Sequence, residues 1–511
     1  MTTPEEGSDR VTGSRDVTHA ARSGAIQVLT IAGQALMAVT HVLLGNLFGA
    51  TVFGRYQAGL AFMEVLTRTG TGGADKGMLR YVAAHRARGE GDLVRSALGT
   101  GLRLALGIGG TLALWLVAGS GIIAYVTHES TLEATLRVMA PAIVFTGCMY
   151  VLVHASLAAK VTHANFIVRG LGEPLLFMAA GLIAAACGRT VMNLAVAHVL
   201  AAAATFTLAL FVVGRVFGRG EIAHAVRSPW LKGFAPFSIP LGAAELMNAI
   251  LQRADVILLT AFVGSTATGV YAAAEFLSRV VGNARYVFDG VAAPVFSEAL
   301  HLGQRDRLRT NLMMMSRWVA TAAAPIAVTI VALRHELLSM YGPTFAAGAS
   351  AIVVLATSHL VNATFGLSGY ILVVSGRSVL MLKNNVAVAV VNVALGLLLI
   401  PRFGIMGAAV AALAGVVLLH TLVTIEVRLA HGVYPVGWST LKPVAAAAIM
   451  LAIERLVSTH VGRPAARIPL VIVAGLVSYL AALVALGLAP EDRALFGRMR
   501  DRVRGWLARA R

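Results

Sequence analysis

The sequence predicts an all-α polytopic membrane protein with about fourteen transmembrane helices, built as two duplicated six-helix lobes followed by two C-terminal helices. Three observations lead to this prediction. The chain is 58% hydrophobic and only 13% charged, whereas an ordinary soluble domain has about 25% charged residues. Apolar stretches long enough to cross a bilayer recur along its whole length. A segment near residue 54 is repeated near residue 269.

The apolar stretches divide the chain into five regions. A spanning helix needs about 20 predominantly apolar residues, and fourteen such candidates begin near residues 24, 53, 96, 133, 168, 191, 234, 267, 311, 344, 381, 404, 440 and 467. The first 23 residues lack the compact apolar core of a signal peptide, so we expect the first span to be retained. The predicted regions are a cytoplasmic tail (1–23), an N-lobe of helices 1–6 (24–220), a C-lobe of helices 7–12 (221–433), helices 13 and 14 (434–489) and a basic amphipathic tail (490–511).

The repeat is a duplication of a whole lobe. A second pair of matching segments, 89–98 and 303–312, continues the first at nearly the same separation. A period this long indicates a duplicated domain rather than stacked small repeats. In membrane proteins such halves commonly flank a transport path. The residues Leu43, Leu44, Gly49, Gly54, Tyr56 and Ala58 recur 215 positions later as Leu258, Leu259, Gly264, Gly269, Tyr271 and Ala273.

The basic residues lie in alternate loops. A formal net charge of +18 would suit a nucleic-acid partner if the charge formed one patch, but the lysines and arginines gather in the N-terminal tail, the loop after span 2, residues 215–232 and the C-terminal tail. The opposite loops are sparse, and residues 126–130 and 263–268 contain no lysine or arginine. The positive-inside rule therefore predicts a multi-pass protein of the inner or plasma membrane with both termini in the cytoplasm. No nucleic-acid partner is expected.

Catalytic, metal and nucleotide motifs are not expected. The two cysteines, Cys148 and Cys187, both lie in predicted spans, which argues against a disulfide framework or a cysteine-based zinc site. The segment 70–77, GTGGADKG, lacks the Gly-Lys-Ser/Thr ending of a phosphate-binding loop. We therefore predict a protein that is not an enzyme and has no cofactor. Its transport would be driven by substrate supply or by coupling to protons or sodium ions.

Polar side chains in the spans mark a candidate site. Charges inside a bilayer are costly and usually face the interior of a helix bundle or a water-filled cavity. In spans 2, 7 and 8 they recur every three or four residues and so share one helix face, while span 1 has only uncharged polar residues and a histidine. Interhelical hydrogen bonding within a packed bundle is the alternative. The candidate substrate-binding residues of this polar lumen are Arg68, Arg279, Glu64, Asp75, Glu245, Asn248, Gln252, Asp255, Glu275 and Asp289.

Two stretches carry a family resemblance. Residues 368–412 contain a Gly-Arg turn, an asparagine-rich span and the segment IPRFGIMGAA, and residues 253–277 form a matching turn between spans 7 and 8. This pattern resembles the polysaccharide-transporter branch (Wzx-like oligosaccharide flippases) of the multidrug/oligosaccharidyl-lipid/polysaccharide (MOP) exporter superfamily. The resemblance implies two six-helix lobes facing across a central cavity that opens to either side in turn, with spans 1, 2, 7 and 8 lining it.

The expected function is the flipping of a polyprenyl-pyrophosphate-linked oligosaccharide from the inner to the outer leaflet. Arg68 and Arg279, on opposite lobes, would bind the pyrophosphate, because a guanidinium group matches phosphate oxygens bidentately. The carboxylates would bind sugar hydroxyls, hold the arginines between cycles or take up coupling ions. The expected partners are the lipid-linked glycan, membrane lipids and the glycosyltransferases or polymerases of polysaccharide synthesis.

The sequence leaves three alternatives to this function open: a lipid II-type flippase for peptidoglycan precursors, a cation-coupled drug or metabolite exporter, and a non-transporting scaffold. Drug exporters of the superfamily often have a carboxylate in span 1, and none occurs between Gly24 and Ala50. Lipid II flippases resemble each other around a Pro-Asn…Arg segment in span 2, of which only Arg68 is present.

Overall fold

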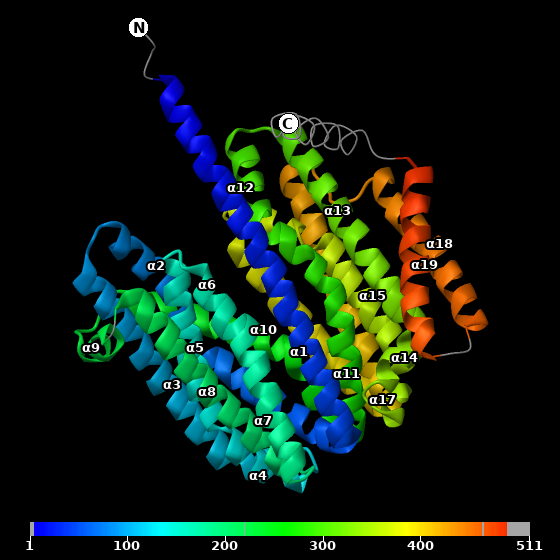
Figure 1. Cartoon of the computed structure of the whole chain (residues 1–511), viewed down its shortest axis with the longest axis horizontal. Coiled ribbons are helices and arrows are strands. Elements are labelled where there is room, and N and C mark those ends of the chain that lie inside the picture. The colour runs from blue at the N-terminus through cyan, green and yellow to red at the C-terminus, as the bar shows by residue number, and fades with distance from the viewer. Residues whose placement is uncertain (1–4, 219, 462–463, 488–511) are drawn as a thin grey trace, which may run out of the picture. The chain divides into compact units, whose positions relative to one another are not determined.

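In the computed structural model of the chain, the described residues are 5–218, 220–461 and 464–487 (Figure 1). Within these ranges every regular element is helical, so the predicted all-α class is confirmed. The predicted basic tail, 490–511, lies outside the described residues. The chain divides into two compact units, residues 1–273 and 274–511. The predicted boundaries at residues 220 and 433 stay predictions.

The first unit contains a long helix, α1, that holds the first two predicted spans. At Gly49 its backbone leaves the helical region (φ 74°), a conformation that glycine adopts easily, so two spans meet there. Helix α1 packs along α7 and α10, while α5 packs against α3 and α8. The helices of this unit are α1 (Glu5–Gly70), α2 (Ala74–Ala87), α3 (Gly91–Val126), α4 (Ser130–Met139), α5 (Pro141–Ala158), α6 (Thr162–Asn165), a π-helical segment (Phe166–Gly172), α7 (Glu173–Cys187), α8 (Val191–Phe217), α9 (Glu221–Arg227), α10 (Phe234–Phe262) and the beginning of α11 (Ser265–Arg279).

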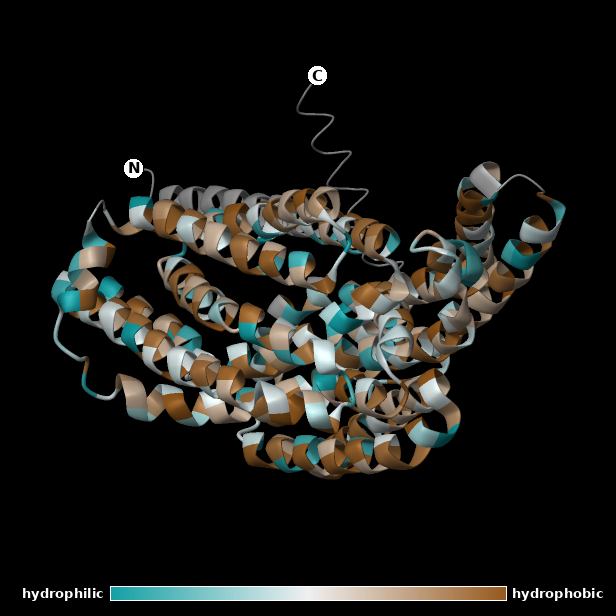
Figure 2. Cartoon of the chain, turned by 90° about the horizontal axis from the view of Figure 1, so that it is seen from below, coloured by the Kyte–Doolittle hydropathy of each residue, from teal (hydrophilic) through white to brown (hydrophobic). Residues whose placement is uncertain are grey.

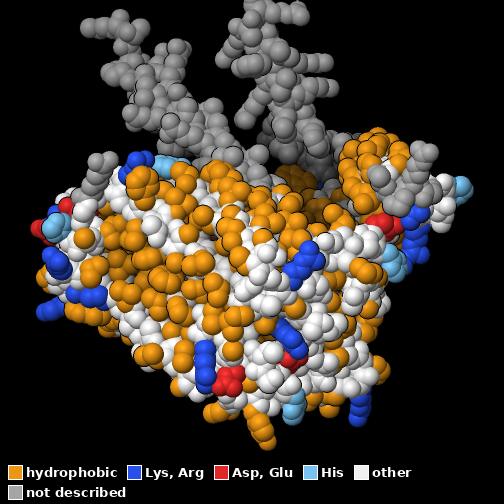
Figure 3. Space-filling view, turned by 60° about the horizontal axis from the view of Figure 1, so that its bottom comes forward, with side chains coloured by type: hydrophobic (Ala, Val, Ile, Leu, Met, Phe, Trp, Pro, Cys, Tyr) orange, Lys and Arg blue, Asp and Glu red, His pale blue; other side chains and the backbone are white. Residues whose placement is uncertain are grey.

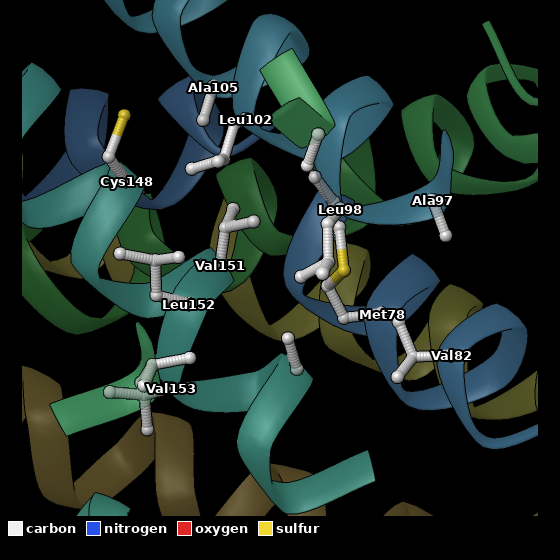
Figure 4. Packing of buried hydrophobic residues seen from close by; sticks show 14 of the residues in the cluster. Met78, Val82, Ala97, Leu98, Leu102, Ala105, Cys148, Val151, Leu152 and Val153 are labelled. Atoms are coloured by element: carbon white, nitrogen blue, oxygen red, sulfur yellow. The ribbon is translucent and has the colours of Figure 1, made fainter. Parts of the chain in front are cut away.

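The core of the first unit lies between α2, α3 and α5. Met78, Leu98 and Val151 are buried there, beside small residues such as Ala97 and Ala105 (Figure 4). Lipid tails are as apolar as these side chains, so helices in a membrane associate through close van der Waals packing rather than by removal of apolar surface from water. Small residues permit that close approach.

The two copies of the duplicated segment meet each other within the first unit. A methyl group at Gly54 of α1 would overlap the backbone of Ser265 and Gly269 in α11, and one at Gly269 would overlap the backbone of Ala50 and Gly54. The hydroxyl groups of Thr51 and Thr266, also 215 positions apart, are 2.8 Å from each other. This crossing is self-complementary, since each copy offers the same surface to the other.

The second unit also contains one helix that holds two predicted spans. Helix α17 is interrupted at Gly404 (φ 54°, ψ −129°), where predicted spans 11 and 12 join. Helix α13 packs against α15 and α18, and α18 lies beside α19. The elements are a 3₁₀ segment (Val280–Arg285), α12 (Tyr286–His301), α13 (Arg305–Ala332), α14 (Arg334–Ser339), a 3₁₀ segment (Pro343–Gly348), α15 (Ala349–Phe365), α16 (Ser368–Val374), α17 (Ser378–His431), a 3₁₀ turn (Trp438–Thr440), α18 (Leu441–His460) and α19 (Pro464–Ala485).

The helices have the composition of membrane spans. Among the described residues, nine helices are long and apolar enough to cross a membrane, or ten if the two bent parts of α10 count as one span. Apolar positions run along the helices, and hydrophilic ones gather toward helix ends and loops (Figure 2). On the face shown in Figure 3, hydrophobic side chains cover a broad area with few charges among them. The multi-pass class is confirmed, and the number fourteen stays a prediction compatible with these helices.

Candidate functional site

A small polar cavity lies within the first unit. It has a volume of about 90 Å³ and is lined from α1, α2, α5, the π-helical segment and α10. Three residues of the predicted site, Arg68, Asp75 and Glu245, meet here. The other lining residues, which sequence reasoning did not assign to the site, are Thr71, Lys76, Tyr150, His154 and Arg169.

A glycine-rich turn places the residues of α2 against α10. Helix α1 ends at Gly70, and Gly72 and Gly73 take positive φ angles of 56° and 68°. A methyl group at Gly73 would overlap the backbone of Ser238, and one at Gly242 would overlap the turn. The turn therefore depends on glycine twice, once for its backbone angles and once for the close approach of the two chains.

Lys76 connects the two carboxylates of the cavity. Its ammonium nitrogen is 3.5 Å from Asp75 Oδ2 and 3.6 Å from Glu245 Oε1. Buried or half-buried charges are tolerated when they are paired. The charge pattern assigned Lys76 to a cytoplasmic loop, and its contribution to the site appears only when α2 is placed beside α10.

Two arginines of the cavity lie over one tyrosine ring. The guanidinium carbon of Arg169 is 4.8 Å from the centroid of the Tyr150 ring, and that of Arg68 is 5.8 Å from it. Arg169 also approaches Glu173, with 4.0 Å between its Nε and the carboxylate. Arg169 lies in the π-helical segment Phe166–Gly172, and such irregular turns occur frequently at functional sites. With Lys76, these arginines bring three cations to one cavity, where the carboxylates of Asp75 and Glu245 offset part of their charge.

Glu64 forms an ion pair with Arg253. Both Nε and Nη2 of Arg253 are 2.5 Å from Oε2 of Glu64, which joins α1 to α10. Arg253 is not among the predicted site residues. Two further predicted site residues lie on α10: Asn248 is half-buried and Gln252 is exposed, at the point where α10 bends by 46°.

Asp255 and its neighbours form a separate group on α10 and α11. The buried Tyr271 hydroxyl donates a hydrogen bond to the Asp255 carboxylate, which also accepts one from the backbone N–H of Val256 at 2.8 Å. In the first copy, the hydroxyl of Tyr56 lies 2.9 Å from Nδ1 of His198. Equivalent tyrosines therefore have chemically different partners.

The remaining predicted residues lie in the second unit. The helical ion pair predicted from the spacing of Glu275 and Arg279 is present, with 2.5 Å between Arg279 Nη2 and Glu275 Oε2. His359 Nε2 is 3.9 Å from the same glutamate. Asp289 pairs with Arg285 at 3.3 Å. Arg68 and Arg279 belong to different units, so their joint role stays a prediction.

No metal centre is found in the described part of the chain, which contains no group of three or more histidine, cysteine, aspartate or glutamate side chains placed to hold an ion. Cys148 and Cys187 are both free cysteines, the first buried and the second exposed. The cavity of the first unit offers cations and carboxylates inside an apolar helical protein.

The family model described as "Polysaccharide biosynthesis protein" matches residues 21–300. Among solved structures, the fold is similar to lipid II flippase MurJ in its inward closed conformation, with a TM-score of 0.69 and 12% identity over 90% of this chain and 97% of that one. An inward-facing multidrug resistance MATE family transporter of the MOP superfamily gives a TM-score of 0.63 and 12% identity, covering 79% and 98%. A comparison with curated protein sequences finds no match. At such identities the structural likeness shows the fold.

Proposed function

The chain belongs to the family of polysaccharide biosynthesis proteins, whose model matches more than half of it, and from this premise we propose that it is a flippase for a lipid-linked oligosaccharide. The substrate would be a polyprenyl-pyrophosphate glycan moved from the inner to the outer leaflet by alternating access. The observation that carries the proposal is the polar cavity inside an apolar helical unit where Arg68, Lys76 and Arg169 meet beside the carboxylates of Asp75 and Glu245.

A pyrophosphate is the part of such a substrate that most needs the protein. Each polar group left unsatisfied in the hydrocarbon core costs several kcal/mol, and an isolated charge costs far more. The two guanidinium groups over Tyr150 present several N–H donors to one region, and a guanidinium binds phosphate oxygens in pairs. The lipid tail would remain in the bilayer.

The carboxylates would hold the cations while no substrate is bound. Asp75 and Glu245 neutralise Lys76, and Glu173 lies beside Arg169. A cation left unpaired in a membrane protein is costly, so the incoming phosphate would exchange places with these carboxylates. The released carboxylates would then be free to bind sugar hydroxyls or to take up a proton or sodium ion.

The carboxylates outside the cavity have separate roles in this proposal. Asp255, Glu275 and Asp289 are each held by a neighbouring side chain. They would be the sites for coupling ions if transport is driven by a gradient. Arg279, paired with Glu275 in the second unit, would be a further candidate for binding the phosphate.

The proposal is tested by replacing the cavity arginines singly. We expect Arg68→Ala and Arg169→Ala to lower the flipping of a fluorescent polyprenyl-pyrophosphate glycan in proteoliposomes about tenfold or more, the effect of removing a charge-assisted hydrogen bond. Arg215→Ala is the matched control, because Arg215 is exposed and stacks on Phe211 instead of lining the cavity. Unchanged flipping in both cavity variants would overturn the proposal.

The same assay separates the alternative substrates. A lipid II-type flippase would move lipid II in preference to a polyprenyl-linked oligosaccharide at equal concentration. A cation-coupled exporter would show gradient-dependent efflux that is lost in Asp255→Asn or Glu275→Gln but tolerates the arginine changes. A scaffold would be insensitive to all of these substitutions.

We further propose an inner-membrane location with both termini in the cytoplasm, which the alternate-loop pattern of basic residues supports. The substrate must be assembled on a lipid carrier before it reaches the cavity. Glycosyltransferases would therefore act before this protein, and a polymerase or transferase on the other side of the membrane would act after it.

A further inference from the structure

A second, larger cavity lies in the second unit. Its volume is about 390 Å³, and it is formed where α12 ends, α13 begins and α17 ends. Three of its lining side chains are basic, namely Arg305, Arg428 and His431, and none of its described lining residues is acidic. We call it the basic end pocket.

The basic groups come together where the end of α17 meets the beginning of α13. Gly432 closes α17 with a positive φ of 66°, and a methyl group there would overlap the Arg305 guanidinium. Arg305 thus lies directly against the last turn of α17, which carries Arg428 and His431. Arg377, at the beginning of the same helix, also interacts electrostatically with His431.

Neighbouring arginines have partners, whereas within the described part of the chain the arginines of the pocket have none. Arg307 pairs with Glu298 at 2.8 Å, and Arg309 donates to the Tyr434 hydroxyl at 3.2 Å. Among the described residues, the Arg305 and Arg428 side chains make no hydrogen bond or ion pair. The buried Nε2 of His431 has no hydrogen-bond partner either. Cations that converge on a cavity without a carboxylate are the arrangement expected for an anion site.

The start of α13 adds to this positive potential. Arg305 is the first residue of a helix that runs to Ala332. The N-terminus of such a helix carries a partial positive charge and unpaired N–H groups, and both favour an anion. The helix terminus and the two pocket arginines therefore place positive charge at the same point, and Asp306 in the first turn of α13 offsets part of it.

We propose that the basic end pocket binds the phosphate head group of an acidic phospholipid. A lipid fits better than a free anion, because the pocket wall also contains Leu308 and Leu429. Leu429 is 82% exposed and the adjacent Leu302 is 58% exposed, which suits contact with acyl chains. The charge pattern predicts that these helix ends face the cytoplasmic leaflet, where acidic lipids attract basic pockets between helices.

This site has a consequence beyond the cavity of the first unit. A lipid head group held there would tie together the ends of α12, α13 and α17. The second unit would then be stabilised by acidic lipids, and its stability would depend on the membrane composition. Substrate binding at Arg68 and Arg169 is not required for this effect, so the two proposals can fail separately.

The experiment measures binding of a fluorescent short-chain phosphatidylglycerol to the purified full chain in detergent. We expect Arg305→Gln and Arg428→Gln each to weaken the affinity about fivefold, the contribution of one basic residue near an acidic lipid. Arg307→Gln removes the same charge from the same segment, but Arg307 lies outside the pocket lining. The affinity of this variant for the lipid should therefore stay within about twofold of that of the parent protein, as expected for a group away from the bound phosphate. Equal binding by all three variants would overturn the proposal.

Displacement of the fluorescent probe by unlabelled compounds identifies the class of ligand that the basic end pocket binds. Unlabelled phosphatidylglycerol should displace the probe, whereas phosphatidylcholine and inorganic phosphate should not do so at the same concentration. Displacement by inorganic phosphate alone at that concentration would overturn the lipid assignment in favour of a free-anion site. Preferential displacement by a polyprenyl phosphate would assign the pocket to the transported lipid instead. If Arg305→Gln fails to fold, Arg428→Gln and Arg305→Lys, which keeps the charge, still decide the question.

Discussion

The two copies of the duplicated segment share a backbone contact and differ in the side chains around it. Gly54 and Gly269 pack against each other's helices, and Thr51 faces Thr266. A contact of this kind resembles a two-fold interface, in which each side must present the same surface to the other. A change at one glycine therefore affects both copies, which is a physical reason for the two segments to remain alike here.

The tyrosines two residues further on show where the copies differ. Tyr271 donates to the Asp255 carboxylate. The residue equivalent to Asp255 in the first copy is Thr40, whose hydroxyl instead donates to the backbone carbonyl of Leu36 at 2.9 Å. Tyr56 has its polar contact with His198 of α8. A buried hydroxyl needs a partner, but different helices can supply it. Side-chain chemistry thus diverged around an unchanged crossing.

The largest expected effect on stability comes from disrupting the contact between the two copies of the duplicated segment. Gly54→Ala should lower the free energy of unfolding by about 2 kcal/mol, because an added methyl group in tight packing forces the backbones apart. The melting temperature of the purified protein in detergent measures this. Gly119→Ala in α3 is the control, because a methyl group there meets no neighbouring atom. If both variants melt at the parent temperature, the crossing is not tightly packed.

The difference between the two tyrosines should be measurable as a smaller effect. Tyr271→Phe removes a hydrogen bond to a carboxylate and should cost about 1.5 kcal/mol, whereas Tyr56→Phe should cost about 0.6 kcal/mol, an average hydrogen bond between membrane helices. Thermal unfolding of the two variants under the same conditions gives the comparison. A larger loss of unfolding free energy for Tyr56→Phe than for Tyr271→Phe would show that the first copy depends more on its tyrosine hydroxyl than the second copy does.

The smallest expected effect concerns the exposed threonine pair. Thr51→Val and Thr266→Val should each cost about 0.5 kcal/mol, and the double variant should cost less than their sum because both remove the same hydrogen bond. A double-mutant cycle on unfolding measures the coupling. Strict additivity would mean that the two hydroxyl groups do not interact in the folded protein.

Sequence reasoning predicted part of the crossing between the two copies and part of the cavity in the first unit. It identified Gly54 with Gly269 and Tyr56 with Tyr271 as copies, because identical residues at a constant separation can be read directly. It did not reveal that the copies touch each other. It placed Arg68, Asp75 and Glu245 on polar stripes, and these three residues line one cavity. It placed Lys76 in the loop after span 2 and did not include Arg169 among the site residues, since a positive charge near the end of a span looks the same whether it faces cytosol or cavity.

The sequence alone determined the membrane class, the helical content, the duplication and the helical pair of Glu275 with Arg279, because hydropathy and helical periodicity are properties of neighbouring residues. Only the tertiary structure decided the long-range partners. Glu64 and Arg68 have the same spacing as Glu275 and Arg279, yet Glu64 pairs with Arg253 of α10. Which of two cations a carboxylate meets depends on how its helix is rotated and which helix packs beside it, and a repeating pattern along one helix does not specify either.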